Sequence, residues 1–442
     1  MKHLNKDTTR PGKAARVNER FDLNGVTSFG GANILFDYAE QIGLGLKLHE
    51  VCTKFEKAAN ATYPLFSSLL VLVFGRTLGL LRIAEFTRLE NDPLLATKFG
   101  FAKLPDAKLL YKDLDRLTTE ATKGLAEVAR WLAARLIKKE KAVILDVDST
   151  VETVYGSLEK AAVGYNPTKR GRASFHPQLG FDGITRTLLG AQLRSGNTTS
   201  RTNVLDFLKD LLGTLPLGTK VKAIRADRGY QGEAVFSFLE ERNLPYVIKA
   251  KMTAPLLDWA DTLTYHPIVT ANDEEILEAA SGLYQASSWE KARRVVIVRK
   301  RLISDRGQLL FTDLTSDYEA IVTTLDWAEE DISAFYNHRC TAETFIKELK
   351  DGFGIDQFSS MSFEANQADL WLKAIAYNLI LAFQSELLPD ADRIFQINTL
   401  RRWFLWIPGR LVRHARSWSL RLPHLPKLAE RFALFRSRLA LV

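Results

Sequence analysis

The sequence predicts an α/β protein in which a mixed sheet flanked by helices follows an all-helical N-terminal domain. Two observations support this prediction. Residues 21–138 keep a helical pattern throughout. At Lys141 the pattern changes to β-branched apolar runs, typical of buried strands, which alternate with helical segments. The 442 residues are enough for about three domains.

The composition excludes several classes of protein. With 46% hydrophobic and 25% charged residues, the chain is neither wholly disordered, nor a collagen, nor a disulfide scaffold. Two cysteines, Cys52 and Cys340, cannot build a disulfide framework or a Cys-rich zinc site. The N-terminus lacks the apolar core of a secretory signal, and the apolar run 65–81 is interrupted by Arg76. We therefore expect a buried helix there and a cytoplasmic protein without a membrane span.

The charge is unevenly distributed along the chain. Residues 401–442 carry a net charge of +9 and residues 1–20 carry +4, whereas the whole chain has only +8 and its middle is therefore acidic. Basic ends suit a polyanionic partner such as nucleic acid. Solvated tails without a partner explain the same pattern.

The elements follow in order. Residues 1–20 resemble a flexible basic arm, and short helices broken at Pro93 and Pro105 permit either a helix-turn-helix DNA module or a plain helical bundle. A long amphipathic helix, 118–141, leads into the sheet domain. There the patterns predict strands at 142–150, 181–197 (two strands), 221–227, 246–249, 293–301 and 309–312, and helices at 202–212, 233–242, 331–350 and 366–387.

Two acidic residues stand where predicted strands end. Asp148 and Asp227 each follow an apolar run, and strand ends direct side chains into a shared crevice at the edge of a sheet. Asp146 lies on the same face as Asp148 and competes with it. A carboxylate on a buried strand is costly unless it is paired or binds a cation, so an ion pair or a cap remains an alternative.

A third acid lies on the predicted helix 331–350. At about 100° per residue, four functional side chains fall within one stripe of roughly 60°: Tyr336, Arg339, Glu343 and Lys350. Lys347 borders this stripe, and Glu348 points away and is the weaker acid candidate. An ordinary exposed helix with an Arg339–Glu343 ion pair is the alternative.

Three carboxylates from two strand ends and one helix form a hard oxygen cluster that suits Mg²⁺ or Mn²⁺. Two such ions can activate a water or a 3′-hydroxyl and stabilise the leaving oxygen when a phosphodiester is displaced. Arg339 and Lys350 could then bind phosphates, and Tyr336 could donate a hydrogen bond.

The spacing Tyr336-x2-Arg339-x3-Glu343-x6-Lys350 resembles the YREK signature of DDE transposases from bacterial insertion sequences. The DST that begins at Asp148 and the ADRGY around Asp227 are similar to the first and second acidic motifs of that group. The resemblance covers roughly residues 60–420. It implies a ribonuclease-H-like catalytic core.

The resemblance also implies roles for these residues. Asp148, Asp227 and Glu343 would be catalytic metal ligands, and Tyr336, Arg339 and Lys350 would contact phosphates of the transposon end. It implies a β-rich insertion at 251–312 and, as a hypothesis, a homodimer that brings two DNA ends together. The resulting division is an arm (1–20), a helical DNA-binding domain (21–138), a core in two parts (139–250 and 313–390) around the insertion, and a basic C-terminal segment (391–442).

Three further features stay open. The basic loop with Lys169, Arg170 and Arg172 could follow a DNA backbone or simply be exposed. His176 and His338 have no spaced cysteine partners, which excludes a Cys/His zinc site. Trp259 or Trp289 could stack on an unpaired base, although a core position is the more usual role.

The expected function is therefore that of a transposase that binds double-stranded DNA, cleaves it and joins 3′-hydroxyl ends to a target, in the cytoplasm beside the nucleoid. A nuclease of the same fold without strand transfer is one alternative. A DNA-binding protein derived from a transposase is another, although such a binder would not need the acids at 148, 227 and 343.

Overall fold

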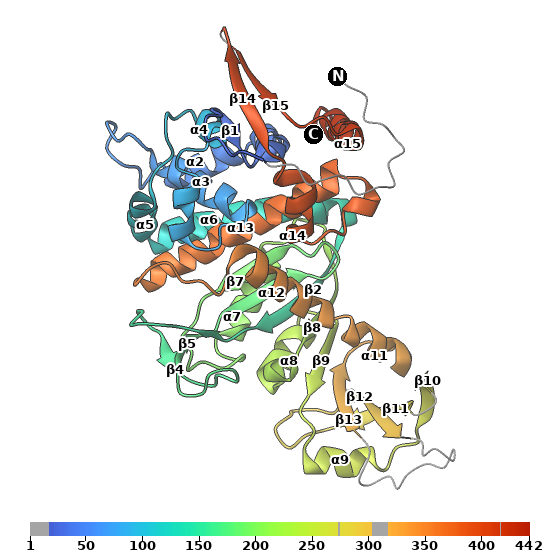
Figure 1. The fold of residues 1–442 in the computed structure, drawn as a ribbon. Coiled ribbons are helices and arrows are strands. Elements are labelled where there is room, and N and C mark those ends of the chain that lie inside the picture. Colours follow the sequence, from blue (N-terminus) through green and yellow to red (C-terminus); the bar gives the residue numbers. More distant parts are fainter. Residues whose placement is uncertain (1–16, 273–274, 303–316, 416) are drawn as a thin grey trace.

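The computed structural model describes residues 17–272, 275–302, 317–415 and 417–442, and the arm expected at 1–20 lies almost entirely outside them (Figure 1). The helical N-terminal part contains a 3-10 helix at Ile83–Arg88 and six α-helices: α1 (Asn33–Gln41), α2 (Leu44–Cys52), α3 (Leu65–Thr77), α4 (Pro93–Phe99), α5 (Ala107–Asp115) and α6 (Thr119–Glu140). The side chains of Asp92, Asp106 and Thr118 cap α4, α5 and α6 by accepting backbone N–H bonds.

Helix α3 is the buried helix that the apolar run predicts. It packs against the long helix α13 (Phe363–Leu387), which also packs against α6. Arg76 is completely buried in α3 because it pairs with Asp369 of α13, and Lys373 pairs with the same carboxylate at 2.7 Å. Among the described residues, no helix is long and apolar enough to cross a membrane.

The centre of the molecule is one mixed sheet of nine strands, which confirms the predicted fold class. Strands β2, β8 and β9 run parallel, and the other neighbours are antiparallel. In spatial order the strands are β10 (His266–Asn272), β11 (Glu275–Tyr284), β12 (Arg293–Leu302), β13 (Asp317–Thr323), β9 (Tyr246–Ala250), β8 (Lys220–Ala226), β2 (Ala142–Ser149), β6 (Gln178–Asp182) and β7 (Leu188–Gln192).

The two faces of the sheet are covered by different helices. On one face Val143, Leu145 and Val147 of β2 pack with α7 (Val204–Gly213) and α8 (Glu233–Glu240). The residues between them, Asp146 and Asp148, point to the other face, which is covered by α12 (Cys340–Phe353) and α13 (Figure 1). This alternation directs the acids of β2 towards α12.

The segment expected as a β-rich insertion does not form a separate sheet. After α9 (Ala254–Ala260), strands β10, β11 and β12 extend the central sheet through β13. The strand expected at 309–312 lies outside the described residues. Trp259 and Trp289 both pack against the hydrophobic core, with ring centroids 5.1 and 5.9 Å from that of Tyr284, which favours the core interpretation over base stacking.

The basic C-terminal segment is folded. It forms α14 (Ile397–Leu400), a π-helix (Arg401–Leu405), a hairpin of β14 (Gly409–His414) and β15 (Ser417–Arg421), and α15 (Pro426–Leu439). Strand β1 (Val26–Thr27) pairs with β14. A second small sheet, β3 (Glu152–Thr153), β5 (Ala173–Phe175) and β4 (Ala162–Val163), starts where β2 ends.

Candidate catalytic site

The two strand-end acids lie side by side. Strands β2 and β8 are parallel neighbours, and Val147 is paired with Ala226, so Asp148 and Asp227 follow at the same level and on the same face. The backbone N–H of Ser149 donates to Oδ1 of Asp148 at 2.8 Å. The N–H of Gly229 donates to Oδ1 of Asp227 at 2.9 Å. Each carboxylate is therefore held by the turn that follows its own strand.

The electrostatics of this pair agree with the geometry. Asp148 is 8% exposed, and burial raises its pKa to about 6; Arg339 opposes the rise and the Asp227 carboxylate adds to it. Two carboxylates that repel each other, one of them buried, are a donor set that favours a bound cation. This donor set fits a divalent metal ion.

Asp146, the competing candidate, is engaged elsewhere. Its two carboxylate oxygens accept from Nε and Nη2 of Arg225 at 2.6 and 2.8 Å, and both side chains are buried. Nη1 of Arg225 donates to the backbone oxygen of Phe335 in α11 (Glu329–Asn337) at 2.8 Å. Asp146 is thus part of a structural ion pair beneath the site.

The helix expected at 331–350 is wrong in one respect: it is two helices, α11 and α12, joined by a turn at His338 and Arg339. The N–H groups of Arg339 and Ala342 bond three residues back, to Tyr336 and Arg339, at 2.7 Å each. These tight bonds replace the four-residue pattern of a continuous α-helix, so the single stripe calculated for one helix does not exist. Tyr336 belongs to α11, whereas Glu343 and Lys350 belong to α12.

Arg339, at this turn, connects the strand acids to the helix acid. Its Nη1 donates to Oδ2 of Asp148 at 2.9 Å, and its Nη2 lies 3.4 Å from Oε1 of Glu343. The Glu343 side chain is 62% exposed. Arg339 thus lies between Asp148 and Glu343 as their counterion, a role that a bound cation could take over while a phosphate becomes the new partner of the guanidinium.

Tyr336 lies under this arginine. Its ring is buried, and the Arg339 guanidinium and the Lys249 ammonium approach its centroid to 5.7 and 5.8 Å. Burial raises the pKa of Tyr336 to about 12, while Arg339 lowers it. The phenol therefore stays protonated at neutral pH and is a hydrogen-bond donor.

Lys350 is held by two residues that sequence reasoning missed. Its Nζ lies 2.7 Å from both Oε1 of Glu152 and Oγ1 of Thr150. Glu152 is buried on β3, just after β2 ends. No spacing in the sequence pairs positions 152 and 350. Glu348, the weaker acid candidate, instead accepts from the backbone N–H of Ile397 at 2.7 Å.

Hydrogen bonds with His176 and Ser200 position Ser149, the residue that follows Asp148. Nε2 of His176 lies 3.0 Å from Oγ of Ser149, and its Nδ1 lies 2.9 Å from the backbone oxygen of Thr198. Oγ of Ser200 is 3.1 Å from Oγ of Ser149. The sequence showed His176 near the basic loop, but not that it positions the residue after Asp148.

The basic loop lies between β4 and β5. Lys169, Arg170 and Arg172 are all exposed, and the Lys169 ammonium contacts the hydroxyl and the ring of Tyr155. The small sheet that carries this loop also carries Glu152, the partner of Lys350. The loop therefore starts from the same small sheet as Glu152, and its three cations are exposed.

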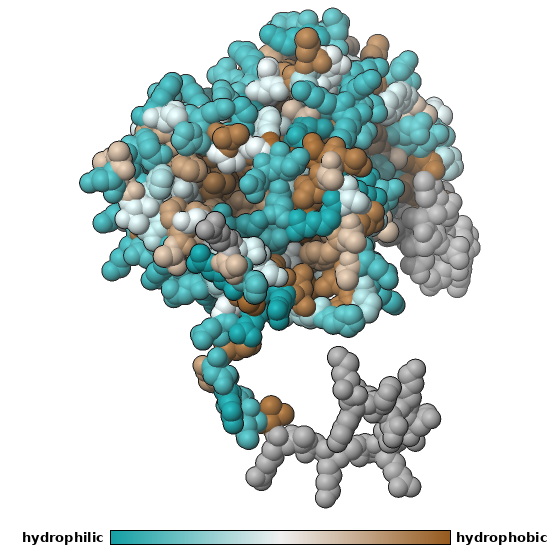
Figure 2. Space-filling model, turned by 90° about the horizontal axis from the view of Figure 1, so that it is seen from above, coloured by the Kyte–Doolittle hydropathy of each residue, from teal (hydrophilic) through white to brown (hydrophobic). Residues whose placement is uncertain are grey.

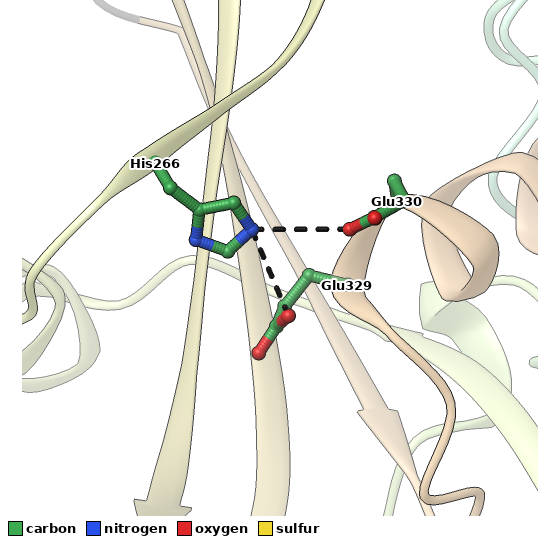
Figure 3. A group of neighbouring side chains, drawn as sticks. All are labelled: His266, Glu329 and Glu330. Atoms are coloured by element: carbon green, nitrogen blue, oxygen red, sulfur yellow. Dashed lines mark ion pairs between the residues drawn. The ribbon is translucent and has the colours of Figure 1, made fainter.

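The three acids do not yet converge on one point. Three or more His, Cys, Asp or Glu side chains can hold a metal ion when their ligand atoms lie close together. Among the described residues, one group has its ligand atoms within 4.8 Å of one another, and it consists of His266, Glu329 and Glu330 (Figure 3). There Nε2 of His266 lies 3.8 Å from each glutamate, and Glu329 also accepts from Ser281 at 2.6 Å. Acids in the first turn of α11 are expected from its dipole, so ion pairing accounts for this group.

Comparison with known proteins identifies the family. The model described as "Transposase DDE domain group 1" matches residues 9–442. Among solved structures, a piggyBac transposase synaptic complex with hairpin DNA is similar, with 9% identity, a TM-score of 0.44, and coverage of 94% of this chain and 80% of that chain. No match is found among curated proteins. The chain belongs to the transposase family with a DDE domain of group 1.

Proposed function

We propose that this chain is the active transposase of a bacterial insertion sequence, with Asp148, Asp227 and Glu343 as its catalytic acids. The observation that supports this most is the pairing of Val147 with Ala226 on adjacent parallel strands, because Asp148 and Asp227 are the next residue of each chain segment. The YREK spacing from Tyr336 to Lys350 supports the assignment to an insertion sequence.

The three acids would hold Mg²⁺ or Mn²⁺, as one or two ions. A divalent cation bound there would stabilise the charge that develops on the oxygens of the scissile phosphate. In the present arrangement Arg339 interacts with two of these acids, so we expect cation and DNA to bind together with a movement of this side chain.

The other side chains then bind and orient the phosphate. Arg339, released from the acids, can grip two phosphate oxygens with its planar guanidinium. Tyr336 donates a hydrogen bond from its protonated phenol. Lys350, fixed by Glu152 and Thr150, supplies an oriented positive charge.

The reaction has two steps in this proposal. Water attacks the phosphorus at the element end and the P–O3′ bond breaks, which leaves a 3′-hydroxyl. This hydroxyl oxygen then attacks a target phosphorus, and the target 3′-oxygen leaves. Solvent takes the proton of the attacking hydroxyl and protonates the leaving 3′-oxygen. The substrate is double-stranded DNA, bound by a homodimer in the synaptic complex, and the protein would act in the cytoplasm on the nucleoid.

The test is nicking of a supercoiled plasmid that carries the element ends, with Mg²⁺. Wild type should nick it, while Asp227→Asn and Glu343→Gln should not, although both should still bind the ends. Asp351→Asn is the matched control, since Asp351 is an exposed acid on the same helix α12.

The products separate the alternatives. Joined molecules indicate a transposase, and nicked molecules without joining indicate a nuclease. Binding without nicking by the wild type would indicate a non-catalytic DNA-binding protein, and equal nicking by all variants would remove these acids from the site.

A further inference from the structure

The β14–β15 hairpin stands out from the body of the molecule, at the opposite end from β10–β13 (Figure 1). Its base is fixed: β14 pairs with β1, and the N–H of Leu411 donates to the backbone oxygen of Gly25 at 2.7 Å. The described residues from 413 to 419 are all exposed. The hairpin is therefore a rigidly rooted ribbon whose outer half contacts solvent.

The charge of this ribbon is of one sign. Residues 409–421 contain four arginines and a histidine but no acid. Arg410 and Arg421 stand directly opposite each other in the register. Among the described residues neither forms an ion pair, and Arg410 donates only to the backbone oxygen of Asn24 at 3.2 Å. Opposed like charges weaken a hairpin unless an anion binds between them, so this pair points to a polyanion.

The other face of the ribbon is apolar near its base and carries an arginine and a tryptophan nearer its tip. Leu411 and Leu420, opposite each other near the base, pack against the core. One pair nearer the tip, on the same face, Arg413 lies opposite Trp418, with its guanidinium 5.6 Å from the ring centroid. Trp418 is 51% exposed. The indole restricts the conformations of the Arg413 side chain and keeps its planar guanidinium at the surface, where it can contact a partner.

We propose that the β14–β15 hairpin enters the major groove of duplex DNA, with Arg410 and Arg421 on phosphates and Arg413 and Trp418 towards the bases. A two-stranded ribbon, with strands about 4.8 Å apart, fits the groove of about 12 Å but not the minor groove of about 6 Å. Figure 2 looks onto the end of the molecule from which the hairpin projects, and hydrophilic residues predominate on it.

This inference rests on the proposed function for its partner, double-stranded DNA. It adds a second contact, away from Asp148 and Asp227, that would hold the duplex at a distance from the bond that is cut. A second copy of the chain is a poorer occupant, because two hairpins of the same positive sign repel each other.

The experiment compares the double variant Arg410→Ala/Arg421→Ala with a control, Lys220→Ala/Lys222→Ala. The control also removes two exposed positive charges, but from the first residues of β8, at the end of the strand away from Asp227. Fluorescence anisotropy measures binding of a 40-base-pair duplex carrying an element end, over a range of salt concentrations. Each lost phosphate contact should lower the affinity about 8-fold at 0.1 M salt, hence about 60-fold for the pair, and should reduce the slope of log K against log salt by about 1.8 in total. The lysine pair should change neither quantity.

Several results would overturn the proposal. The first is an arginine variant that keeps the wild-type affinity and salt slope, and the second is an equal loss of affinity in the arginine and lysine variants. The third is single-stranded DNA that binds as tightly as the duplex. The fourth is an arginine variant that no longer dimerises but keeps its affinity for DNA. Trp418→Ala, which leaves the charge unchanged, should weaken binding without changing the salt slope. Nicking with Mg²⁺ at saturating protein should survive in the arginine variant, whereas absence of nicking in the wild type would count against the proposed function alone.

Discussion

The buried pair beneath the site gives the sharpest prediction about stability. Replacing Asp146 by Asn keeps its volume but leaves the Arg225 guanidinium buried without a counter-charge, at 2% exposure. Two charge-assisted bonds, at 2.6 and 2.8 Å, are lost or weakened. Removing one partner of a buried ion pair costs about 3–5 kcal/mol, so we expect Asp146→Asn to lower the free energy of unfolding by that amount.

Urea unfolding followed by circular dichroism measures the effect. Asp227→Asn is the control, because Asp227 is only half-buried and its loss relieves a repulsion, so its midpoint should not fall. The double variant Asp146→Leu/Arg225→Met should recover most of the loss, since apolar residues can replace a buried ion pair. Asp146→Asn should still nick DNA, whereas Asp148→Asn should not. An unchanged midpoint together with loss of nicking in Asp146→Asn would refute the assignment and make Asp146 the ligand.

Three more predictions follow from the surroundings of the acids. Mg²⁺ should raise the melting temperature of the wild type but not of Asp227→Asn, because a cation relieves the repulsion at Asp148; equal shifts would argue against a shared cation. Burial lowers the pKa of His176 below 6.5, so the unfolded chain binds a proton that the folded chain does not, and stability should fall as the pH drops below about 6.5. His176→Gln should flatten this dependence in a pH series of unfolding curves, and identical slopes would contradict the assignment. Lys350→Met leaves the buried Glu152 carboxylate without its counter-charge and should destabilise by about 1–3 kcal/mol. Adding Glu152→Gln should restore stability but not nicking, and restored nicking would show that Lys350 has no role at the phosphate.

The strand-end acids could be predicted from sequence because their signal is local. An apolar, β-branched run that ends in an acid gives both the strand and the place of the carboxylate, and β2 and β8 match these runs. The match of Val147 to Ala226 could not be predicted, since register depends on contacts between segments far apart in the chain. The DST motif favours Asp148 over Asp146, but the ion pair of Asp146 with Arg225 depends on the same long-range contacts and has no signal in the sequence.

The turn at Arg339 had no local signal. Residues 331–350 have no proline or glycine, so their periodicity indicates one helix. The hydrogen bonds at the turn orient Arg339 towards Asp148. In the same way, the C-terminal hairpin has few apolar residues, and its fold depends on pairing with Val26 and Thr27 from the other end of the chain.

The most direct test of the central claim is anomalous scattering from crystals of the full chain soaked in Mn²⁺ together with element-end DNA. We expect a manganese peak next to carboxylate oxygens of Asp148 and Asp227, with Glu343 moved closer to it and Arg339 bound to a phosphate. A peak at His266, Glu329 and Glu330 alone, with Arg339 still bonded to Asp148 and Glu343, would contradict this expectation.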